Sequence, residues 1–198
     1  MNKAIRRRLA FAVAVLGTTL SLALPSVAQE KLVITLDTPP GHVRNQWIGK
    51  FAEALTERSE GRLTTEVFDS GQLVSSRDAG KAVARGDVGM AIVATPALAR
   101  IEANLNVLDL PMFNGMAQAG KDKVVDGPLG QELAKMTAEK MHVVVPGKWY
   151  VLGALNTYST EKAVGSFADL KDMQIRIPGA ASWIAAYKAW GATPVNLP

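Results

Sequence analysis

Short apolar segments alternate with longer amphipathic segments along this chain. Buried strands are predicted at residues 31–36, 63–68, 88–94 and 174–177, which have the length and the β-branched content typical of such strands. Apolar side chains at helical spacing occur at residues 44–59, 76–85, 128–141 and 180–190. Because strands and helices follow one another in turn, the pattern predicts an α/β protein with a largely parallel sheet.

Residues that favour helix ends bound these segments. Glycines at positions 61, 86 and 191 follow three of the predicted helices, and Pro128 suits the first turn of a fourth. Ser166 and Asp169 have the spacing of a capping box and predict a short helix. Residues 142–145 and 149–156 are predicted to be two further strands, and a last strand is expected to open after Gly191.

The four tryptophans divide into two groups. Trp47 and Trp190 fall on helix faces, where we expect them to pack in the core. Trp149 and Trp183 belong either to the core or to the wall of a ligand pocket, because an indole supplies both apolar area and a hydrogen-bond donor.

The N-terminal segment has the pattern of a secretory signal peptide. Positions 1–8 form a basic region with four basic residues and no acid, apolar residues dominate positions 9–24, and small residues occupy positions 26 and 28. The apolar stretch is short for a membrane span of about 20 residues. We therefore expect residues 1–28 to be removed near Ala28 and the mature chain to work in the periplasm. An uncleaved, membrane-tethered ligand sensor is the alternative.

Charge and composition exclude several classes of function. The formal net charge of +4 comes from Lys3, Arg6, Arg7 and Arg8, since the remaining 18 basic residues equal the 18 acidic ones. The mature chain thus gives no support for a nucleic-acid partner. Without cysteine, and with only His42 and His142, it offers no cysteine-ligated metal site and no multi-histidine centre. Phosphate-binding glycine motifs are also missing, so we expect no cofactor.

Arg176 stands out because it interrupts an apolar strand. Its guanidinium needs a partner there, and its planar fork matches a carboxylate bidentately. A structural salt bridge or an outward-facing position is the alternative. Ligands in parallel α/β folds collect at the carboxyl ends of strands, which adds Asp37, Ile92 and Asn156 to the candidate ligand-binding residues, together with Trp149.

Several motifs are similar to those of one transport family. They are FAEALTERSEGRL (residues 51–63), GQL (71–73), RGDVGMA (85–91), DLPMF (109–113), FADLKDMQIRIP (167–178) and GATP (191–194). The chain resembles the solute-binding proteins of tripartite ATP-independent periplasmic (TRAP) transporters, the DctP-like family. The resemblance implies two α/β domains joined by a hinge around a ligand cleft. It also implies that Arg176 grips the carboxylate of an organic acid, which is then delivered to a membrane permease.

Departures from the family pattern bear on the ligand. Asn156 stands where some relatives carry a second arginine, twenty residues before Arg176. Asp37 stands where those relatives place an asparagine, and Ile92 where they place a glutamate. The resemblance then implies a less polar pocket that favours a small or partly apolar monocarboxylate over a dicarboxylate. A secreted α/β enzyme acting on a small carboxylate is the alternative function.

The expected domain organisation has three parts. Residues 1–28 form the signal peptide, residues 29–150 a first α/β domain, and residues 151–198 the start of a second domain that is truncated relative to the family. With half of that domain missing, we expect apolar side chains to be partly uncovered at Ile175, Ile177, Trp183 and Ile184.

Overall fold

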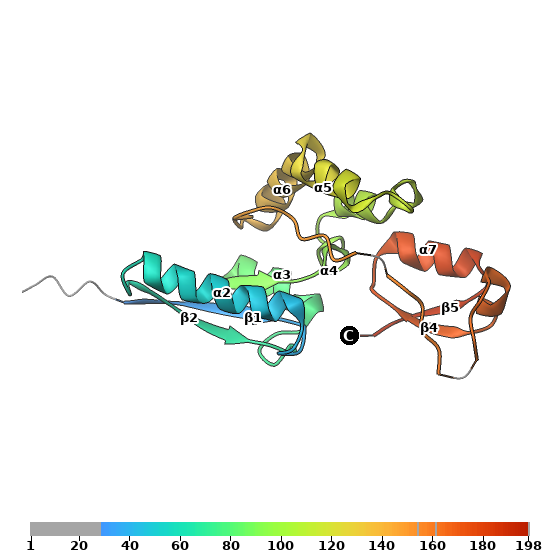
Figure 1. The fold of residues 1–198 in the computed structure, drawn as a ribbon, viewed down its shortest axis with the longest axis horizontal. Helices are drawn as coiled ribbons and strands as arrows, with labels where there is room; N and C mark the ends of the chain where they lie inside the picture. The colour runs from blue at the N-terminus through green and yellow to red at the C-terminus, as the bar shows by residue number, and fades with distance from the viewer. Residues whose placement is uncertain (1–28, 154, 161, 198) are drawn as a thin grey trace, which may run out of the picture.

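The fold begins with a three-stranded parallel sheet (Figure 1). A computed structural model describes residues 29–153, 155–160 and 162–197 of the chain. The central strand β1 (Glu30–Leu36) pairs on one side with β2 (Leu63–Phe68) and on the other with β3 (Met90–Ile92). All three strands run the same way, as the alternation of strands and helices predicts.

Two helices connect the strands of this sheet, α2 (Val43–Arg58) and α3 (Ser76–Arg85). Helix α2 packs on the sheet through Ile48, which forms a buried cluster with Ile34 and Leu36 of β1. Gly86 ends α3 in the left-handed conformation (φ 77°), which glycine adopts without steric cost. The predicted crossover helices are confirmed.

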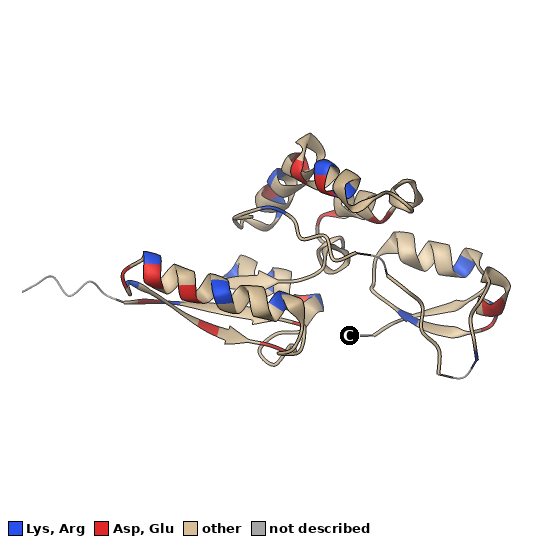
Figure 2. Ribbon diagram, viewed as in Figure 1, with Lys and Arg blue, Asp and Glu red and all other residues tan. Residues whose placement is uncertain are grey.

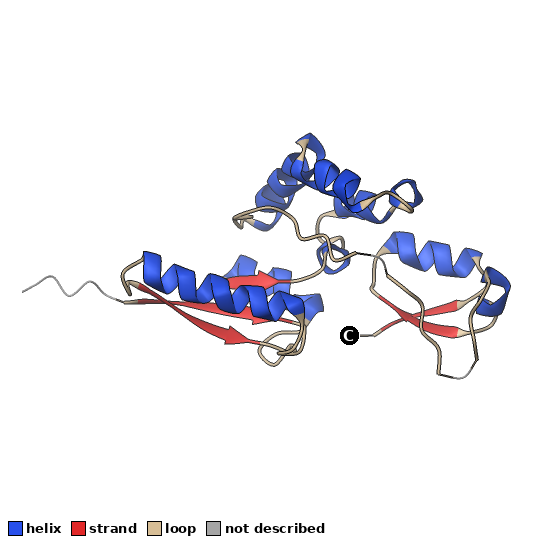
Figure 3. Cartoon of the chain, in the orientation of Figure 1, coloured by secondary structure: helices blue, strands red, loops and turns tan. Residues whose placement is uncertain are grey.

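Residues 95–141 form a helical layer without strands (Figure 3). Its helices are α4 (Thr95–Leu98), η1 (Ala103–Asp109), η2 (Pro111–Phe113), α5 (Gln118–Asp126) and α6 (Pro128–Met141). Leu105 of η1 and Leu133 of α6 are buried together with Ala99. Helix α5 was not expected, and it has no buried residue, so its sequence carries little apolar periodicity.

Two predicted strands are wrong. Residues 142–145 form no strand: His142 takes a left-handed conformation (φ 54°) as the cap of α6, and the next three residues pair with no strand. The described residues of 149–156 pair with no strand; Trp149 instead donates its indole N–H to the Gly130 carbonyl of α6, at 3.0 Å. Apolar content alone misled the prediction, because a strand also needs a neighbour to pair with.

A second, two-stranded parallel sheet lies further along the chain. Strand β4 (Gln174–Ile177) pairs with β5 (Thr193–Asn196), and η3 (Phe167–Leu170) and α7 (Ala181–Ala189) accompany them (Figure 1). Asp169 and Ser166 form the predicted capping box at the start of η3. The last predicted strand is also present.

The expected exposure of the second sheet is wrong for its central residues. Ile175 and Ile177 are buried in a cluster with Leu170 and Ala192, whereas Trp183 and Ile184 of α7 pack against this cluster and stay partly exposed, as expected. One helix is therefore enough to cover the inward face of a two-stranded sheet.

Two tryptophans expected in the core lie at the surface instead. The exposed fraction is 57% for Trp47 and 38% for Trp190. Lys50 lies over the Trp47 ring, 4.4 Å from its centre, while Trp190 contacts Phe167 and Tyr187. The apolar faces of these two helices are therefore wider than the area that the sheets cover, and the tryptophans at their margins stay exposed.

Charged side chains of both signs are interspersed over the described helices (Figure 2). No helix in the described ranges has the length and apolar character needed to cross a bilayer. The expected signal peptide, residues 1–28, lies outside the described residues.

Candidate anion-binding site

Strand β4 presents Arg176 on its outward face because side chains alternate along a strand. Ile175 and Ile177 point into the core, whereas Gln174 and Arg176 are exposed. The arginine is thus anchored on a rigid strand while its guanidinium stays accessible. Arg176 therefore faces outward and forms no structural salt bridge with the described residues, and its role in ligand binding stays a prediction.

The guanidinium of Arg176 is oriented by the backbone that follows β5. Its Nε donates a hydrogen bond to the Leu197 carbonyl oxygen at 3.0 Å. The two terminal nitrogens make no hydrogen bond or ion pair with any residue that the structure describes. Their N–H groups are therefore available for a carboxylate, which an arginine fork binds with two parallel hydrogen bonds.

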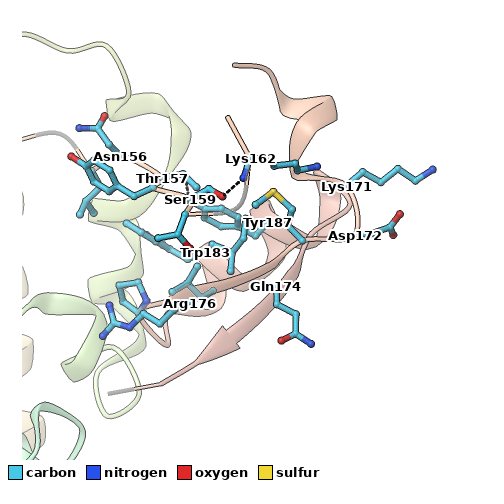
Figure 4. A pocket seen from close by; sticks show the side chains of 17 residues that line it. Asn156, Thr157, Ser159, Lys162, Lys171, Asp172, Gln174, Arg176, Trp183 and Tyr187 are labelled. Carbon is cyan, nitrogen blue, oxygen red and sulfur yellow. Dashed lines mark hydrogen bonds between the residues drawn. The ribbon is translucent and has the colours of Figure 1, made fainter. Parts of the chain in front are cut away.

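An open pocket of about 900 Å³ lies in front of this strand (Figure 4). Its walls are residues 155–160, β4 with the residues before it, and two side chains of α7, Trp183 and Tyr187. Its ionisable lining consists of three cations and one acid: Lys162, Lys171, Arg176 and Asp172, with two tyrosine hydroxyls besides. Lys171 and Asp172 both extend away from the other lining side chains in Figure 4, and the remaining charges, on Arg176 and Lys162, favour an anionic occupant.

A hydrogen bond fixes the loop that forms one wall. The Thr157 hydroxyl and the Tyr187 hydroxyl lie 2.8 Å apart and join residues 155–160 to α7 (Figure 4). No local motif indicates this pair, since its members are 30 residues apart in sequence. Neither residue was therefore predicted from the sequence to lie at the site.

Two of the predicted site residues meet at this pocket. Asn156 and Arg176 both line it, and Figure 4 shows them toward the same end with Trp183 between them. Trp183 had been left open between core and pocket, and it serves both, because it also packs on the core of the second sheet.

The other predicted site residues lie on or near the first sheet. Asp37 follows the carboxyl end of β1, and Ile92 ends β3 in register with Leu36. Ile92 packs against the sheet's buried cluster. Asp37 forms an ion pair with Arg44 of α2, with Nη2 of Arg44 at 3.0 Å from Oδ1. Neither residue lines the pocket around Arg176.

Trp149 lies against the core of the helical layer. It packs against the cluster of Leu105 and Leu133 and uses its indole N–H on the Gly130 carbonyl. Its role in ligand binding stays a prediction.

Trp183 also connects the pocket to η1. Helix α7 contacts η1, and Asp109 at the end of η1 lies beside the Trp183 side chain, with its Oδ2 buried and without a hydrogen-bond partner among the described residues. Burial raises the pKa of Asp109 above its ordinary value, and the neighbouring Trp183 side chain offsets part of this rise. The ionised form of Asp109 is therefore less favourable in the folded protein than in the unfolded chain.

Replacing Asp109 with asparagine should stabilise the protein near neutral pH. A carboxyl whose pKa is raised on folding loses stability as the pH rises through its folded value, and an amide keeps an oxygen beside Trp183 without that loss. We expect the melting temperature of D109N to exceed that of the wild type at about pH 7, and the difference to shrink toward about pH 4. Equal differences at both pH values would contradict this account; Asp122→Asn, at an exposed position, is the control.

Within the described ranges, no three acidic, histidine or cysteine side chains gather in a way that could hold a metal ion.

The fold has a counterpart among solved structures. The fold matches the crystal structure of a TRAP periplasmic solute binding protein from a Sulfitobacter species with bound β-D-galacturonate. Its TM-score is 0.79 at 21% sequence identity, over 85% of this chain and 55% of that one. The predicted α/β, periplasmic-binding-protein-like fold is thus confirmed.

Two curated relatives extend the similarity to sequence. The 2,3-diketo-L-gulonate-binding periplasmic protein YiaO of Escherichia coli is 28% identical over 87% of this chain and 52% of its own length. The C4-dicarboxylate-binding protein DctB of Bacillus subtilis is 29% identical over 82% of this chain and 44% of its length. This chain spans about half the length of the curated relatives that it matches.

A family model covers most of the chain. The model for bacterial extracellular solute-binding protein, family 7 (DctP) matches residues 36–198, which include β2, β3, the helical layer, the second sheet and Arg176. The resemblance in the sequence motifs is therefore confirmed, and the chain belongs to the DctP family of bacterial extracellular solute-binding proteins.

Proposed function

We propose that this protein captures a small organic-acid anion in the periplasm and delivers it to the membrane permease of a TRAP transporter. The observation that carries the proposal is Arg176, whose terminal N–H groups face solvent at a pocket with a cationic lining. The names of the relatives support it, since they bind 2,3-diketo-L-gulonate, C4-dicarboxylates and β-D-galacturonate.

The two sheets would supply the two walls of the binding site. In this proposal residues 29–150 form one domain and contribute Asp37 and Ile92, while residues 151–198 belong to a second domain with Asn156 and Arg176. Closure of the walls on a hinge would bury the carboxylate against Arg176 and exclude water. Residues 1–28 would direct export and be cleaved near Ala28.

The proposed role is binding without catalysis and without a cofactor. A hydrolytic enzyme would need a nucleophile and a base within hydrogen-bond reach of one another near the bound acid. His42 and His142 both lie outside the lining of the Arg176 pocket, and its one carboxylate, Asp172, points outward in Figure 4.

A thermal-shift screen of the mature protein against organic acids tests this function. The panel contains D-galacturonate, D-glucuronate, pyruvate, lactate, hexanoate and succinate. A ligand that binds only the native state at 100 times its Kd stabilises it by about 2.7 kcal/mol, which raises the melting temperature by several degrees. A panel without any such shift, or conversion of an acid detected by NMR, would contradict the proposal.

Asn156 should set the preference for monocarboxylates. It offers a neutral donor and acceptor where an arginine would demand a second anionic group. We therefore expect monocarboxylates and hydroxy acids to bind more tightly than succinate. Asn156→Arg should improve succinate binding about tenfold or more relative to the best monocarboxylate, since a charged hydrogen bond contributes about 1.5–3 kcal/mol. Isothermal titration calorimetry measures both; a wild type that prefers succinate would contradict the assignment.

A further inference from the structure

Arg44 occupies an unusual position for a cation. It lies in the first turn of α2, where His42 caps the helix by accepting a hydrogen bond from the Arg44 backbone N–H at 3.1 Å. No acidic residue is present in that turn. Because the amino end of a helix carries partial positive charge, an arginine there is electrostatically unfavourable. Its presence needs a reason other than the stability of α2.

The Arg44 side chain is also nearly buried. Its exposed fraction is 10%, and its ion-pair partner Asp37 is 26% exposed. The Nη2–Oδ1 contact of 3.0 Å does not have hydrogen-bond alignment, and Nε of Arg44 has no partner among the described residues. Burying a charged pair with incomplete hydrogen bonding stabilises a fold little. A purely structural role therefore explains the pair poorly.

The loop that holds this pair is rigid. Thr38 and Asn45 close it with two hydrogen bonds: the Thr38 hydroxyl donates to Asn45 Oδ1 at 2.5 Å, and Asn45 Nδ2 donates to the Thr38 carbonyl at 3.0 Å. The backbone N–H groups of Ser70 and Gly71 anchor it to the end of β2, through the carbonyls of Thr38 and Leu36. Asp37 and Arg44 are thus held in a fixed relation at the carboxyl end of β1.

The surroundings make Arg44 the dominant charge on this wall. It lines an apolar pocket of about 420 Å³ with Trp47, Tyr150, Leu152 and two valines, and it is the one charged residue in that lining. Asp37 does not itself line this pocket but pairs with Arg44, and without that partner its charge would repel an organic anion. Paired with Arg44, the same carboxylate is neutralised and can still accept hydrogen bonds from a neutral group.

We propose that Arg44 is a positioning residue that makes Asp37 an acceptor for a hydroxyl group of the bound acid. The inference rests on the proposed function and narrows its ligand class to hydroxylated monocarboxylates. Arg44 cancels the charge that would exclude an anion and orients the carboxylate. Asp37 then distinguishes a hydroxy acid from an alkyl acid of the same length.

A double-mutant cycle tests this role. Wild type, D37N, R44Q and D37N/R44Q are titrated with D-glucuronate and with hexanoate, which has six carbons but no hydroxyl group. We expect D37N alone to weaken glucuronate binding about threefold to tenfold, and R44Q alone to weaken it more than tenfold. In the R44Q background D37N should strengthen glucuronate binding, because it removes an unpaired charge. Hexanoate should bind more weakly than glucuronate to the wild type and should not be affected by D37N alone.

The reversed sign of D37N separates positioning from a structural role. If Arg44 only stabilised α2, D37N would act in the same direction in both backgrounds, and this result would overturn the proposal while leaving the proposed function intact. Melting temperatures of the four unliganded proteins test the pair itself; additive losses would also overturn it. A wild type that binds neither acid but binds another acid of the panel would overturn the selectivity role alone, whereas a wild type that binds no acid of the panel would count against the proposed function.

Discussion

Replacing Arg176 with alanine is expected to remove most of the affinity for an organic-acid anion. The variant deletes the fork whose terminal N–H groups face the pocket and leaves a buried carboxylate unpaired in the closed protein. Truncating one partner of such a charge pair costs about 2–5 kcal/mol, which corresponds to a loss of about 30-fold to several thousand-fold in Kd. Isothermal titration calorimetry with the strongest acid of the screen measures this loss.

Two further variants show that the effect belongs to the fork. Arg176→Lys should recover only part of the affinity, because an ammonium group keeps the charge but not the bidentate geometry. Arg77→Ala, at an exposed position of α3 beside the first sheet, should leave the affinity unchanged. Because Arg176 is itself exposed, R176A should keep the wild-type melting temperature in the absence of ligand. Unchanged affinity in R176A would remove Arg176 from the binding site.

The parts of the fold that follow from local pattern were predictable from the sequence. The alternation in Gln174–Ile177 predicts both the strand and the outward position of Arg176, and Ser166 with Asp169 predicts the start of η3. These features depend on neighbouring residues, whose spacing a sequence displays directly.

Features that depend on tertiary partners were not predictable in this way. Residues 142–145 have strand-like composition, yet the left-handed turn at His142 sends them away from any sheet. The Thr157–Tyr187 hydrogen bond forms only after segments 30 residues apart meet, and the Asp37–Arg44 ion pair forms only after the loop between β1 and α2 has folded. Asn156 and Arg176 do line one pocket, as the rule for strand ends and the family resemblance both predicted, and their role in ligand binding stays a prediction.

Gly130→Ala is expected to be the most destabilising single methyl addition in the helical layer. Gly130 is buried in α6, where the chain has just turned out of α5. A Cβ at this position would lie 1.7 Å from the Val125 carbonyl oxygen and 2.5 Å from its carbon, and both atoms belong to the backbone. No rotamer change can relieve that overlap, so α5 and α6 must move apart.

The expected cost of G130A is at least about 2 kcal/mol, which lowers the melting temperature by about 4–8 °C. The shift of α6 should also break the hydrogen bond from Trp149 to the Gly130 carbonyl and move the indole N–H resonance of Trp149 in an NMR spectrum. Gly49→Ala provides the matched control, because Gly49 lies inside α2 and its added methyl would meet nothing within 4 Å. That variant should gain about 0.5–1 kcal/mol from the higher helix propensity of alanine. Equal melting temperatures for the two variants would show that α5 and α6 do not approach as closely at Gly130 as their backbones indicate.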